Sequence, residues 1–362
     1  MKHLFFTVTN DLTYDQRMHR ICTSLAENGY KVTLVGRSKK NSLSLREEVY
    51  NQYRLTCFFQ KGKLFYIEFN LRLFFYLLFK KMDGICAIDL DTIIPCLFIS
   101  QLKNIERIYD AHEYFTEMKE LQHRKKVQNF WLSIEKFAVP KFRYCYTVSD
   151  GLAETFNRKY NKDFISIRNI SKLLQISSKV EETEFILYQG AVNEGRGLEY
   201  LIPAMQFIST PLVICGDGNY MSETKTLINK YGLQEKVKLK GMILPDALKN
   251  ITLKATLGIN LTETEGHHHY YALPNKFFDY IHACLPQITM NLPEYRKINK
   301  RFEVAVLIDD LEIDTIAEAI NKTLNNKELL LILKQNCLKA REVFNWEQEE
   351  KKLLQFYKVI FR

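Results

Sequence analysis

Residues 4–35, LFFTVTNDLTYDQRMHRICTSLAENGYKVTLV, contain a strand pattern, a helix pattern and a second strand pattern in succession. Leu4–Val8 is a short apolar run. Four apolar residues then recur at the spacing of one helical face: Tyr14, Met18, Ile21 and Leu25. Asn28-Gly29 is a typical helix C-cap, and Lys31–Val35 is the next apolar run. This order predicts a βαβ unit in a parallel sheet.

The same alternation continues through the rest of the chain. The first half contains further strand patterns at 55–59, 85–88, 106–109 and 144–148, and helix patterns at 70–80, 92–101, 124–137 and 150–159. The second half contains strand patterns at 185–188, 211–215, 237–239, 256–260, 287–290 and 304–308, and helix patterns at 197–207, 220–231, 245–251, 312–324 and 326–343. The alternation predicts an α/β fold with two doubly wound, Rossmann-like domains.

The polar segment 170–183 lacks both periodicities, so we expect it to link two domains, residues 1–169 and 184–345. A chain of 362 residues with 46% hydrophobic content is also too long for one ordinary core. Residues 346–362 predict a terminal helix. This helix either completes the second domain or returns to brace the first, and the sequence does not separate the two.

Charge and cysteine usage narrow the class of protein. The net charge of +9 suits a phosphate-bearing ligand or an anionic membrane surface better than nucleic acid. The eight cysteines are dispersed, which argues against a zinc ribbon or a disulfide framework and for a reducing cytoplasm. The apolar segment 64–79 is interrupted by Glu68 and Arg72 and is shorter than the ~20 residues that span a bilayer, so we expect a buried or interfacial helix.

The stretch 261–286, LTETEGHHHYYALPNKFFDYIHACLP, joins an acidic, histidine-rich loop to a helix start. Pro274 is expected at the first helical position. The N–H groups of that start, with Lys276 one turn inside, suit an anion such as a phosphate. A capped helix with solvated charges explains the same residues.

Glycine spacing bears on which nucleotide the chain binds. The loop 9–17 after the first strand has no glycine, so the G-x-G-x-x-G dinucleotide fingerprint is missing where an oxidoreductase needs it. Gly190, Gly195 and Gly197 follow a later strand, and Arg196 stands at the next helix entry, where it can help to hold a diphosphate. The alternative is a surface arginine on a turn.

Three further groups of polar residues are candidates for chemistry. His112 follows a strand and can shuttle a proton near neutral pH, or it is a buried structural histidine. Asp89 and Asp91 form an Asp-x-Asp pair, but we expect Asp91 to be a helix N-cap rather than a metal ligand. His267–His269 are adjacent in a loop, and adjacent residues rarely converge on one metal, so no metal site is expected.

The segment 119–126, KELQHRKK, is a basic patch before a predicted helix that contains Phe130 and Trp131. Basic residues beside aromatic residues are typical of a surface that rests on anionic lipid. A solvated loop is the alternative.

In this order the motifs resemble the retaining glycosyltransferases of family four, in the branch found in bacterial polysaccharide and lipopolysaccharide assembly. The resemblance covers nearly the whole chain and rests on DQR at 15–17, AIDLDT at 87–92, YDAHE at 109–113, TVSDGLAE at 147–154, IRN at 167–169, QGAVNEGRGLEYLIPA at 189–204, CGDGN at 215–219 and PNKFFDY at 274–280. It implies a GT-B fold, in which two Rossmann-like domains face a central cleft.

The resemblance implies donor-binding roles in the second domain. Arg196 and Lys276 would neutralise the diphosphate of the donor. The turn Gly216, Asp217 and Gly218 would approach its base or ribose, and Asn275 belongs to the same donor-binding helix start as Lys276. Asp279 replaces the Glu that the family places at the ribose hydroxyls.

The resemblance also implies catalytic and acceptor-side roles. His112 would lie near the transferred sugar, and Asp11 and Arg17 would lie on the acceptor side. Glu263 is expected to contact the sugar, although it precedes Asp279 by 16 residues where the family's two acids are eight apart. Glu265, or backbone N–H groups near 267–271, are the alternatives for this contact.

The implied activity is transfer of a hexosyl group from a UDP- or GDP-linked sugar to a glycan or lipid-linked acceptor, with retention. No metal or other cofactor is implied. The expected location is the cytoplasm, with contact at the inner face of the membrane. Two alternatives remain, a nucleotide-sugar epimerase of the same fold and a non-catalytic nucleotide-sugar-binding subunit.

Overall fold

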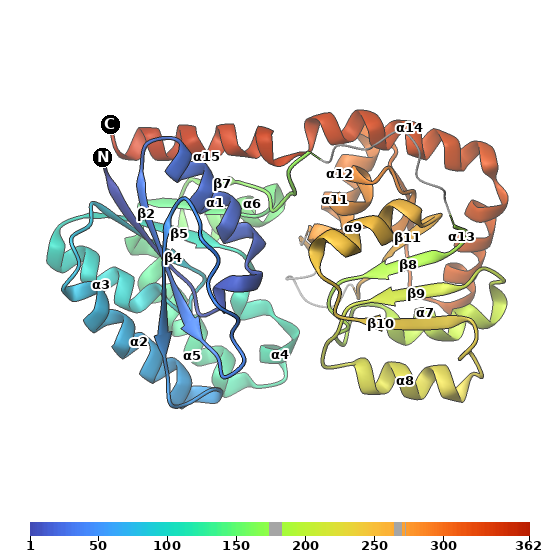
Figure 1. The fold of residues 1–362 in the computed structure, drawn as a ribbon, viewed down its shortest axis with the longest axis horizontal. Coiled ribbons are helices and arrows are strands. Elements are labelled where there is room, and N and C mark those ends of the chain that lie inside the picture. Colours follow the sequence, from blue (N-terminus) through green and yellow to red (C-terminus); the bar gives the residue numbers. More distant parts are fainter. Residues whose placement is uncertain (174–182, 264–269, 272) are drawn as a thin grey trace. The chain divides into compact units, whose positions relative to one another are not determined.

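The computed structural model describes residues 1–362 except 174–182, 264–269 and 272 (Figure 1). The chain divides into two compact units. Met1–Asn169 and Gln348–Arg362 belong to the first, and the described residues from Ile170 to Glu347 belong to the second. Each unit is a parallel β-sheet covered by helices, which confirms the predicted α/β class. Most of the predicted linker, residues 174–182, lies outside the described residues.

The first unit contains a seven-stranded sheet in the order β3-β2-β1-β4-β5-β6-β7. All its neighbouring strands are parallel. The strands are β1 (His3–Thr7), β2 (Lys31–Ser38), β3 (Asn51–Thr56), β4 (Gly84–Ile88), β5 (Glu106–Ala111), β6 (Tyr144–Thr147) and β7 (Phe164–Ser166). Parallel strands are covered on both faces, which is why the central strand β4 reads as the uninterrupted buried run GICAI.

The helices of the first unit follow these strands. They are α1 (Gln16–Glu27), α2 (Gly62–Leu78), α3 (Ile93–Lys103), α4 (Lys119–Gln122), α5 (Lys125–Ala138) and α6 (Asp150–Tyr160). α1 begins at an N-cap, Asp15, whose side chain accepts a hydrogen bond from the backbone N–H of Met18. Its buried residues include Met18, Ile21 and Leu25 of the predicted helical face.

In its described part, the second unit contains a six-stranded parallel sheet in the order β10-β9-β8-β11-β12-β13. The strands are β8 (Ile186–Gln189), β9 (Leu212–Cys215), β10 (Val237–Gly241), β11 (Leu257–Asn260), β12 (Gln287–Met290) and β13 (Ala305–Ile308). The helices are α7 (Leu198–Ala204), α8 (Met221–Lys230), α9 (Pro245–Lys254), α11 (Asn275–His282), α12 (Pro293–Phe302), α13 (Ile313–Asn325) and α14 (Lys327–Val343). The sheet order reverses beside β8, so the loops after β8 and β11 leave the sheet at a topological switch point.

Several element boundaries differ from the sequence prediction. β3 spans Asn51–Thr56 rather than 55–59, because this edge strand alternates exposed and half-buried residues and carries a weak apolar signal. α2 spans Gly62–Leu78, which agrees with the helix expected over the apolar segment 64–79. The narrower helix pattern at 70–80 begins too late, because α2 is apolar on both faces and its helical period is obscured. β7 and α12 were not predicted at all. Pro274 is the N-cap of α11, and the first helical residue is Asn275.

The last helix, α15 (Trp346–Ile360), belongs to the first unit from Gln348 onward. Tyr357 of α15 is fully buried, with its ring centroid 6.0 Å from that of Phe6 in β1. Its hydroxyl oxygen lies 3.4 Å from that of Tyr146 in β6. Where α15 ends, a Cβ at Gly84 would lie 2.4 Å from the ring of Phe361, so the end of the chain packs tightly on β4.

No helix in the described parts of the chain combines the length and the apolar character that a membrane crossing needs.

Tyr357→Ala should destabilise the first unit by about 3–5 kcal/mol, because truncating a fully buried aromatic side chain leaves a cavity in the core. Urea unfolding followed by circular dichroism measures the loss. Val359→Ala is the matched control, since Val359 lies on the same helix and is 48% exposed. Equal effects of the two substitutions would contradict the packing described for α15.

Candidate functional site

The loop after β8 carries Arg196 and approaches the end of β11. Gly195 and Gly197, on either side of Arg196, both have left-handed backbone, with φ of 77°. A Cβ at Gly197 would lie 2.5 Å from the Cβ of Leu261, which follows β11. Glycine is therefore needed at this position for its backbone conformation and for the close approach.

The segment after β11 is hydrogen-bonded to the same loop. The backbone N–H of Glu263 donates to the carbonyl oxygen of Gly195 at 2.9 Å, and the Thr262 hydroxyl donates to that oxygen at 3.3 Å. These bonds bring Glu263, the predicted sugar contact, to the loop that carries Arg196. The alternative contacts Glu265 and His267–His269 lie outside the described residues.

The turn after β9 packs backbone to backbone against the β8 loop. The N–H of Val192 donates to the carbonyl oxygen of Asp217 at 3.0 Å. A Cβ at Gly216 would lie 1.8 Å from the carbonyl oxygen of Gly190, and one at Gly218 would lie 2.2 Å from that of Val192. Close backbone packing thus explains why glycine stands at both positions. The contact of this turn with a base or ribose stays a prediction.

Lys276 lies in the first turn of α11 and is only 7% exposed. Its ammonium nitrogen lies 4.0 Å from the ring centroid of Tyr188 in β8, which is a cation–π contact. Burial lowers the pKa of Lys276 well below its ordinary value, and the positive charge of Arg196 lowers it further. Tyr188 was not predicted as a site residue, because a tyrosine inside an apolar strand carries no signal of a role.

These two cations lack an acidic partner in the part of the chain that the structure describes. The salt bridges there include neither Lys276 nor Arg196, yet each is close enough to affect its neighbours electrostatically. A buried ammonium near a guanidinium is unfavourable unless an anion joins them. The arrangement therefore suits a phosphate or diphosphate group.

Asp279 and Asn275 also lie on α11, in different surroundings. Oδ1 of Asp279 accepts a hydrogen bond from the Ser171 hydroxyl at 2.9 Å, and Oδ2 accepts one from the side-chain amide of Gln189 at 3.1 Å. Gln189 is itself held by the Thr252 hydroxyl at 2.7 Å. Asp279 is thus fixed at the end of β8, whereas the Asn275 side chain is exposed.

His112 is the centre of a buried charge network in the first unit. It directly follows β5, and its Nε2 lies 2.8 Å from Oδ2 of Asp110. Asp110 is fully buried, and its other oxygen lies 3.0 Å from Nη2 of Arg17. Arg17 in turn donates to the carbonyl oxygen of Ile167 at 2.8 Å. Asp110 had no predicted role, although its place two residues before His112 was the available signal.

This network shifts the pKa of both His112 and Asp110. Burial by itself would lower the pKa of His112, but the charge and hydrogen bond of Asp110 outweigh it and raise that pKa. Burial would likewise raise the pKa of Asp110, but Arg17 and His112 outweigh it and lower that pKa. The network therefore favours a protonated His112 paired with an ionised Asp110.

The two predicted acceptor-side residues both form ion pairs inside the first unit. Asp11 pairs with Arg54 at 2.6 Å and also accepts hydrogen bonds from Thr13 and Ser42. Arg17 is 3% exposed and pairs with Asp110. In this geometry Arg17 acts on His112 through Asp110, and direct contact of Asp11 or Arg17 with an acceptor stays a prediction.

The Asp-x-Asp pair corrects one prediction. Asp91 is not the N-cap of α3, because Thr92 takes that position, and Asp91 instead accepts a hydrogen bond from the Thr9 hydroxyl. Burial raises the pKa of Asp91 to about 6. Asp89 accepts backbone hydrogen bonds from His112 at 2.8 Å and Glu113 at 3.3 Å. Among the described residues, no group of three or more His, Cys, Asp or Glu side chains is placed to hold a metal.

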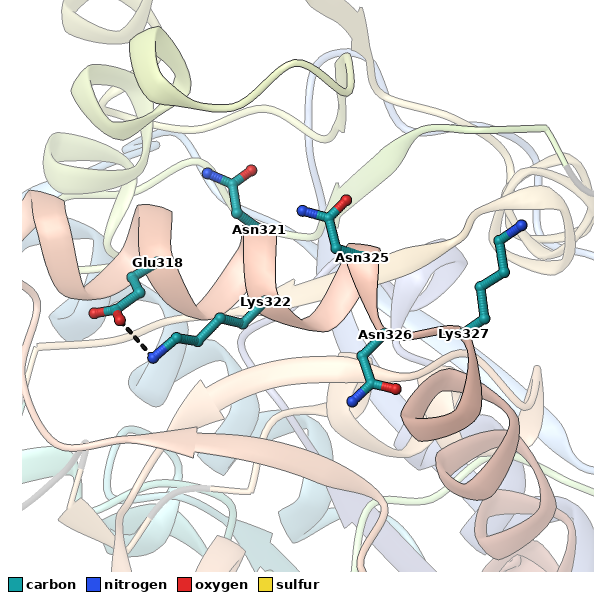
Figure 2. Close-up of a pocket in the computed structure, with 6 residues that line it drawn as sticks. All are labelled: Glu318, Asn321, Lys322, Asn325, Asn326 and Lys327. Carbon is teal, nitrogen blue, oxygen red and sulfur yellow. Dashed lines mark ion pairs between the residues drawn. The ribbon is translucent and has the colours of Figure 1, made fainter.

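A shallow depression of about 800 Å³ lies elsewhere in the second unit, where α13 meets α14 (Figure 2). Its labelled lining residues are Glu318, Asn321, Lys322, Asn325, Asn326 and Lys327, and none of them was predicted as a site residue. Glu318 and Lys322 pair across one turn of α13 and are largely exposed. Open, polar and solvated, this depression is a poor candidate for a binding site.

Solved structures of other proteins show which fold the chain has. Sucrose-phosphate synthase from Thermosynechococcus elongatus superposes with a TM-score of 0.80 at 16% identity, covering 100% of this chain and 99% of that one. HepE from Anabaena, in complex with UDP-glucose, superposes at 0.78 with 10% identity, covering 99% and 100%. WaaG, a glycosyltransferase involved in lipopolysaccharide biosynthesis, superposes at 0.76 with 14% identity, covering 99% of each chain. The fold is therefore the predicted GT-B fold.

A family comparison adds information about the second unit. Residues 169–340 match the family described as "Glycosyl transferases group 1". The matched range contains Arg196, Glu263, Lys276 and Asp279. The second unit therefore contains a domain that matches this family, and the chain as a whole has the GT-B fold. A comparison with curated protein sequences gave no match.

The His112–Asp110 contact predicts a measurable titration. His112 should titrate above the ordinary value of about 6.5 for histidine, and Asp110→Asn should lower its pKa, because the substitution removes the negative charge that stabilises the imidazolium. The stabilisation from the native contact is fully present below about pH 6.5 and is lost as the pH rises through the folded-state pKa. NMR titration of the imidazole proton signals measures both values.

His3 provides an internal control for this titration. Burial lowers its pKa, and Asp110 is not among the groups that affect it, so Asp110→Asn should leave its titration unchanged. A His112 titration that is the same in the wild type and the variant would contradict the network.

Proposed function

We propose that this protein transfers a sugar from a nucleotide-diphosphate sugar, UDP- or GDP-linked, to a glycan or lipid-linked acceptor with retention and without a metal. One observation carries the proposal. Lys276 is buried next to the charge of Arg196, and the described residues supply no acidic partner for either cation. A donor diphosphate supplies the missing negative charge.

The two cations would also assist the chemical step. Negative charge builds on the diphosphate as the bond to the sugar breaks, and cations held in place before the reaction stabilise that charge. Lys276 is held by its burial and by the face of Tyr188, so little reorganisation is needed when the donor arrives. The proposal assigns to Arg196 and Lys276 the electrostatic role that a metal has in other transferases.

His112 is the proposed catalytic group on the acceptor side. The contact with Asp110 orients its ring and favours its protonated form, which suits a hydrogen bond to a sugar hydroxyl. The proposed retention of configuration rests on the sequence resemblance alone. A glycosidase-type mechanism would need a pair of catalytic carboxylates, and no such pair is proposed here. A front-face route, in which the leaving phosphate accepts the acceptor's proton, fits these residues.

Removing either cation should weaken nucleotide binding. Lys276→Met and Arg196→Ala should each raise the Kd for UDP or GDP roughly ten- to hundredfold, the equivalent of about 1.5–3 kcal/mol for a charge-assisted hydrogen bond. Isothermal titration calorimetry measures the Kd. Lys276→Met should also raise the melting temperature of the ligand-free protein, because it removes a buried charge and keeps the apolar stem.

Lys249→Ala is the matched control for both measurements. Lys249 is an exposed lysine of the second unit that pairs with Asp246, so its loss should change neither the Kd nor the melting temperature. If all three variants bound UDP and GDP as the wild type does, the proposed diphosphate site would be wrong.

His112→Ala should abolish sugar transfer while leaving the Kd for the donor nearly unchanged. The assay is consumption of UDP- or GDP-sugars in the presence of lipid-linked and oligosaccharide acceptors. Formation of an altered nucleotide sugar without an acceptor would favour an epimerase. Donor binding without consumption of any donor would favour a non-catalytic binding subunit.

A further inference from the structure

Helix α2 of the first unit has large apolar side chains on two opposite faces. One row is buried in the unit and consists of Phe65, Phe69, Leu73 and Leu77. A second row points outward and consists of Leu64, Ile67, Leu71 and Phe75, which we call the α2 outer row. These four side chains are between 53% and 57% exposed. Spacings of three and four residues place them along one helical face.

Apolar residues at both ends extend the outer row. Phe58 and Phe59, before the helix, are 86% and 47% exposed, and Phe79, after it, is 81% exposed. Single exposed apolar residues are common on protein surfaces, but a continuous row of this kind marks an interaction surface. The side chains of the α2 outer row are exposed to water in the isolated chain, so only a partner could cover them.

The charges around this row are predominantly positive. Residues 58–81 contain five basic residues, Lys61, Lys63, Arg72, Lys80 and Lys81, and one acidic residue, Glu68. Glu68 is already engaged, since it accepts hydrogen bonds from the backbone N–H groups of Phe58 and Phe59 and pairs with Arg72 at 2.7 Å. No ion pair within the described residues involves the four lysines of this segment.

The neighbouring helices carry the same combination of residues. α2 contacts α3, and α3 contacts α5, and Figure 1 shows the three helices next to one another on the first unit. Leu102 of α3 is 66% exposed, and Phe130 of α5 is 59% exposed. Lys125 and Lys126 at the start of α5 are exposed as well.

The charge and length of α2 favour a membrane surface over a second copy of the chain or a membrane crossing. A second copy of this chain would bring two positively charged rims together, which costs energy. α2 has 17 residues, fewer than the ~20 that span a bilayer, so it is not a crossing segment. A helix with an apolar face and lysines or arginines at its edges suits the interface of an anionic membrane, where the apolar side chains enter the lipid and the basic ones reach the headgroups.

We propose that the α2 outer row, with the lysines that flank it, lies on the surface of an anionic lipid bilayer and holds the first unit there. The row inserts its aliphatic and aromatic side chains among the acyl chains, and Lys61, Lys63, Lys80 and Lys81 contact the lipid phosphates. None of these residues belongs to the proposed diphosphate site or to the His112 network, so the inference does not depend on the proposed reaction.

Co-sedimentation of the full-length protein with vesicles tests the proposal. The wild type should bind vesicles that contain phosphatidylglycerol more tightly than vesicles of phosphatidylcholine alone, and added salt should weaken this binding. Ile67→Gln, Leu71→Gln and Phe75→Gln combined should weaken it by about tenfold or more. Lys80→Glu with Lys81→Glu should remove most of the preference for the anionic lipid.

The control variant combines Leu331→Gln and Leu338→Gln on α14 of the second unit, where the side chains are 56% and 51% exposed. It replaces apolar side chains that are about as exposed as those of the α2 outer row, and it should bind vesicles as the wild type does. All variants should keep the wild-type melting temperature and the wild-type Kd for UDP, which shows that folding and nucleotide binding are intact. A loss of nucleotide binding would thus be seen separately from a loss of membrane binding.

Three results would overturn the proposal. The first is a wild type that does not sediment with anionic vesicles at low salt. The second is a triple variant that binds them as tightly as the wild type. The third is a wild-type dimer in light scattering that the triple variant converts to a monomer, since this would assign the α2 outer row to a second copy of the chain.

Discussion

A charge that is removed from water needs a compensating charge, and the two units meet this requirement differently. In the first unit the buried carboxylate of Asp110 is flanked by Arg17 at 3.0 Å and His112 at 2.8 Å. In the second unit the buried ammonium of Lys276 lies over the ring of Tyr188 and is subject to the like charge of Arg196, and no described residue forms an ion pair with it. The first network is complete in the protein alone, whereas the second becomes favourable once an anion is present. This difference supports the proposal that the second unit binds a diphosphate.

Close backbone contacts, which only glycine permits, position the loops that carry the charged residues of the second unit. Gly197 lets the loop with Arg196 approach Leu261, and Gly216 and Gly218 let the turn after β9 contact the β8 loop. The carbonyl oxygen of Gly195 then accepts hydrogen bonds from Thr262 and from the backbone of Glu263. Loops from non-adjacent parts of the sequence are thereby joined at the carboxyl ends of β8, β9 and β11, where open parallel sheets bind their ligands. The lysine on α11 completes the same group of residues.

Helices and strands could be predicted from the sequence wherever the apolar residues of a segment followed one clear periodicity. The apolar runs of β1 and β2 and the helical spacing of α1 predicted the first βαβ unit, because burial on one face produces a regular pattern. The prediction was weaker where burial does not separate the faces. For α2, which is apolar all round, the helical period alone placed the start eight residues late, and α12, with few apolar residues, was missed. The Asp91 cap was wrong because Thr9, 82 residues away, competes for the same carboxylate.

The sequence by itself determined the α/β class and the residue types of both charged groups, because periodicity and local motifs are properties of neighbouring residues. Only the tertiary structure decided what those residues do to one another. Asp110 and Arg17 are 93 residues apart in the chain, and Lys276 is far in sequence from Tyr188. Whether a charge is paired, buried or exposed depends on contacts between such distant segments. For the same reason the outward face of α2 was recognisable only once the inward row had been placed against the sheet.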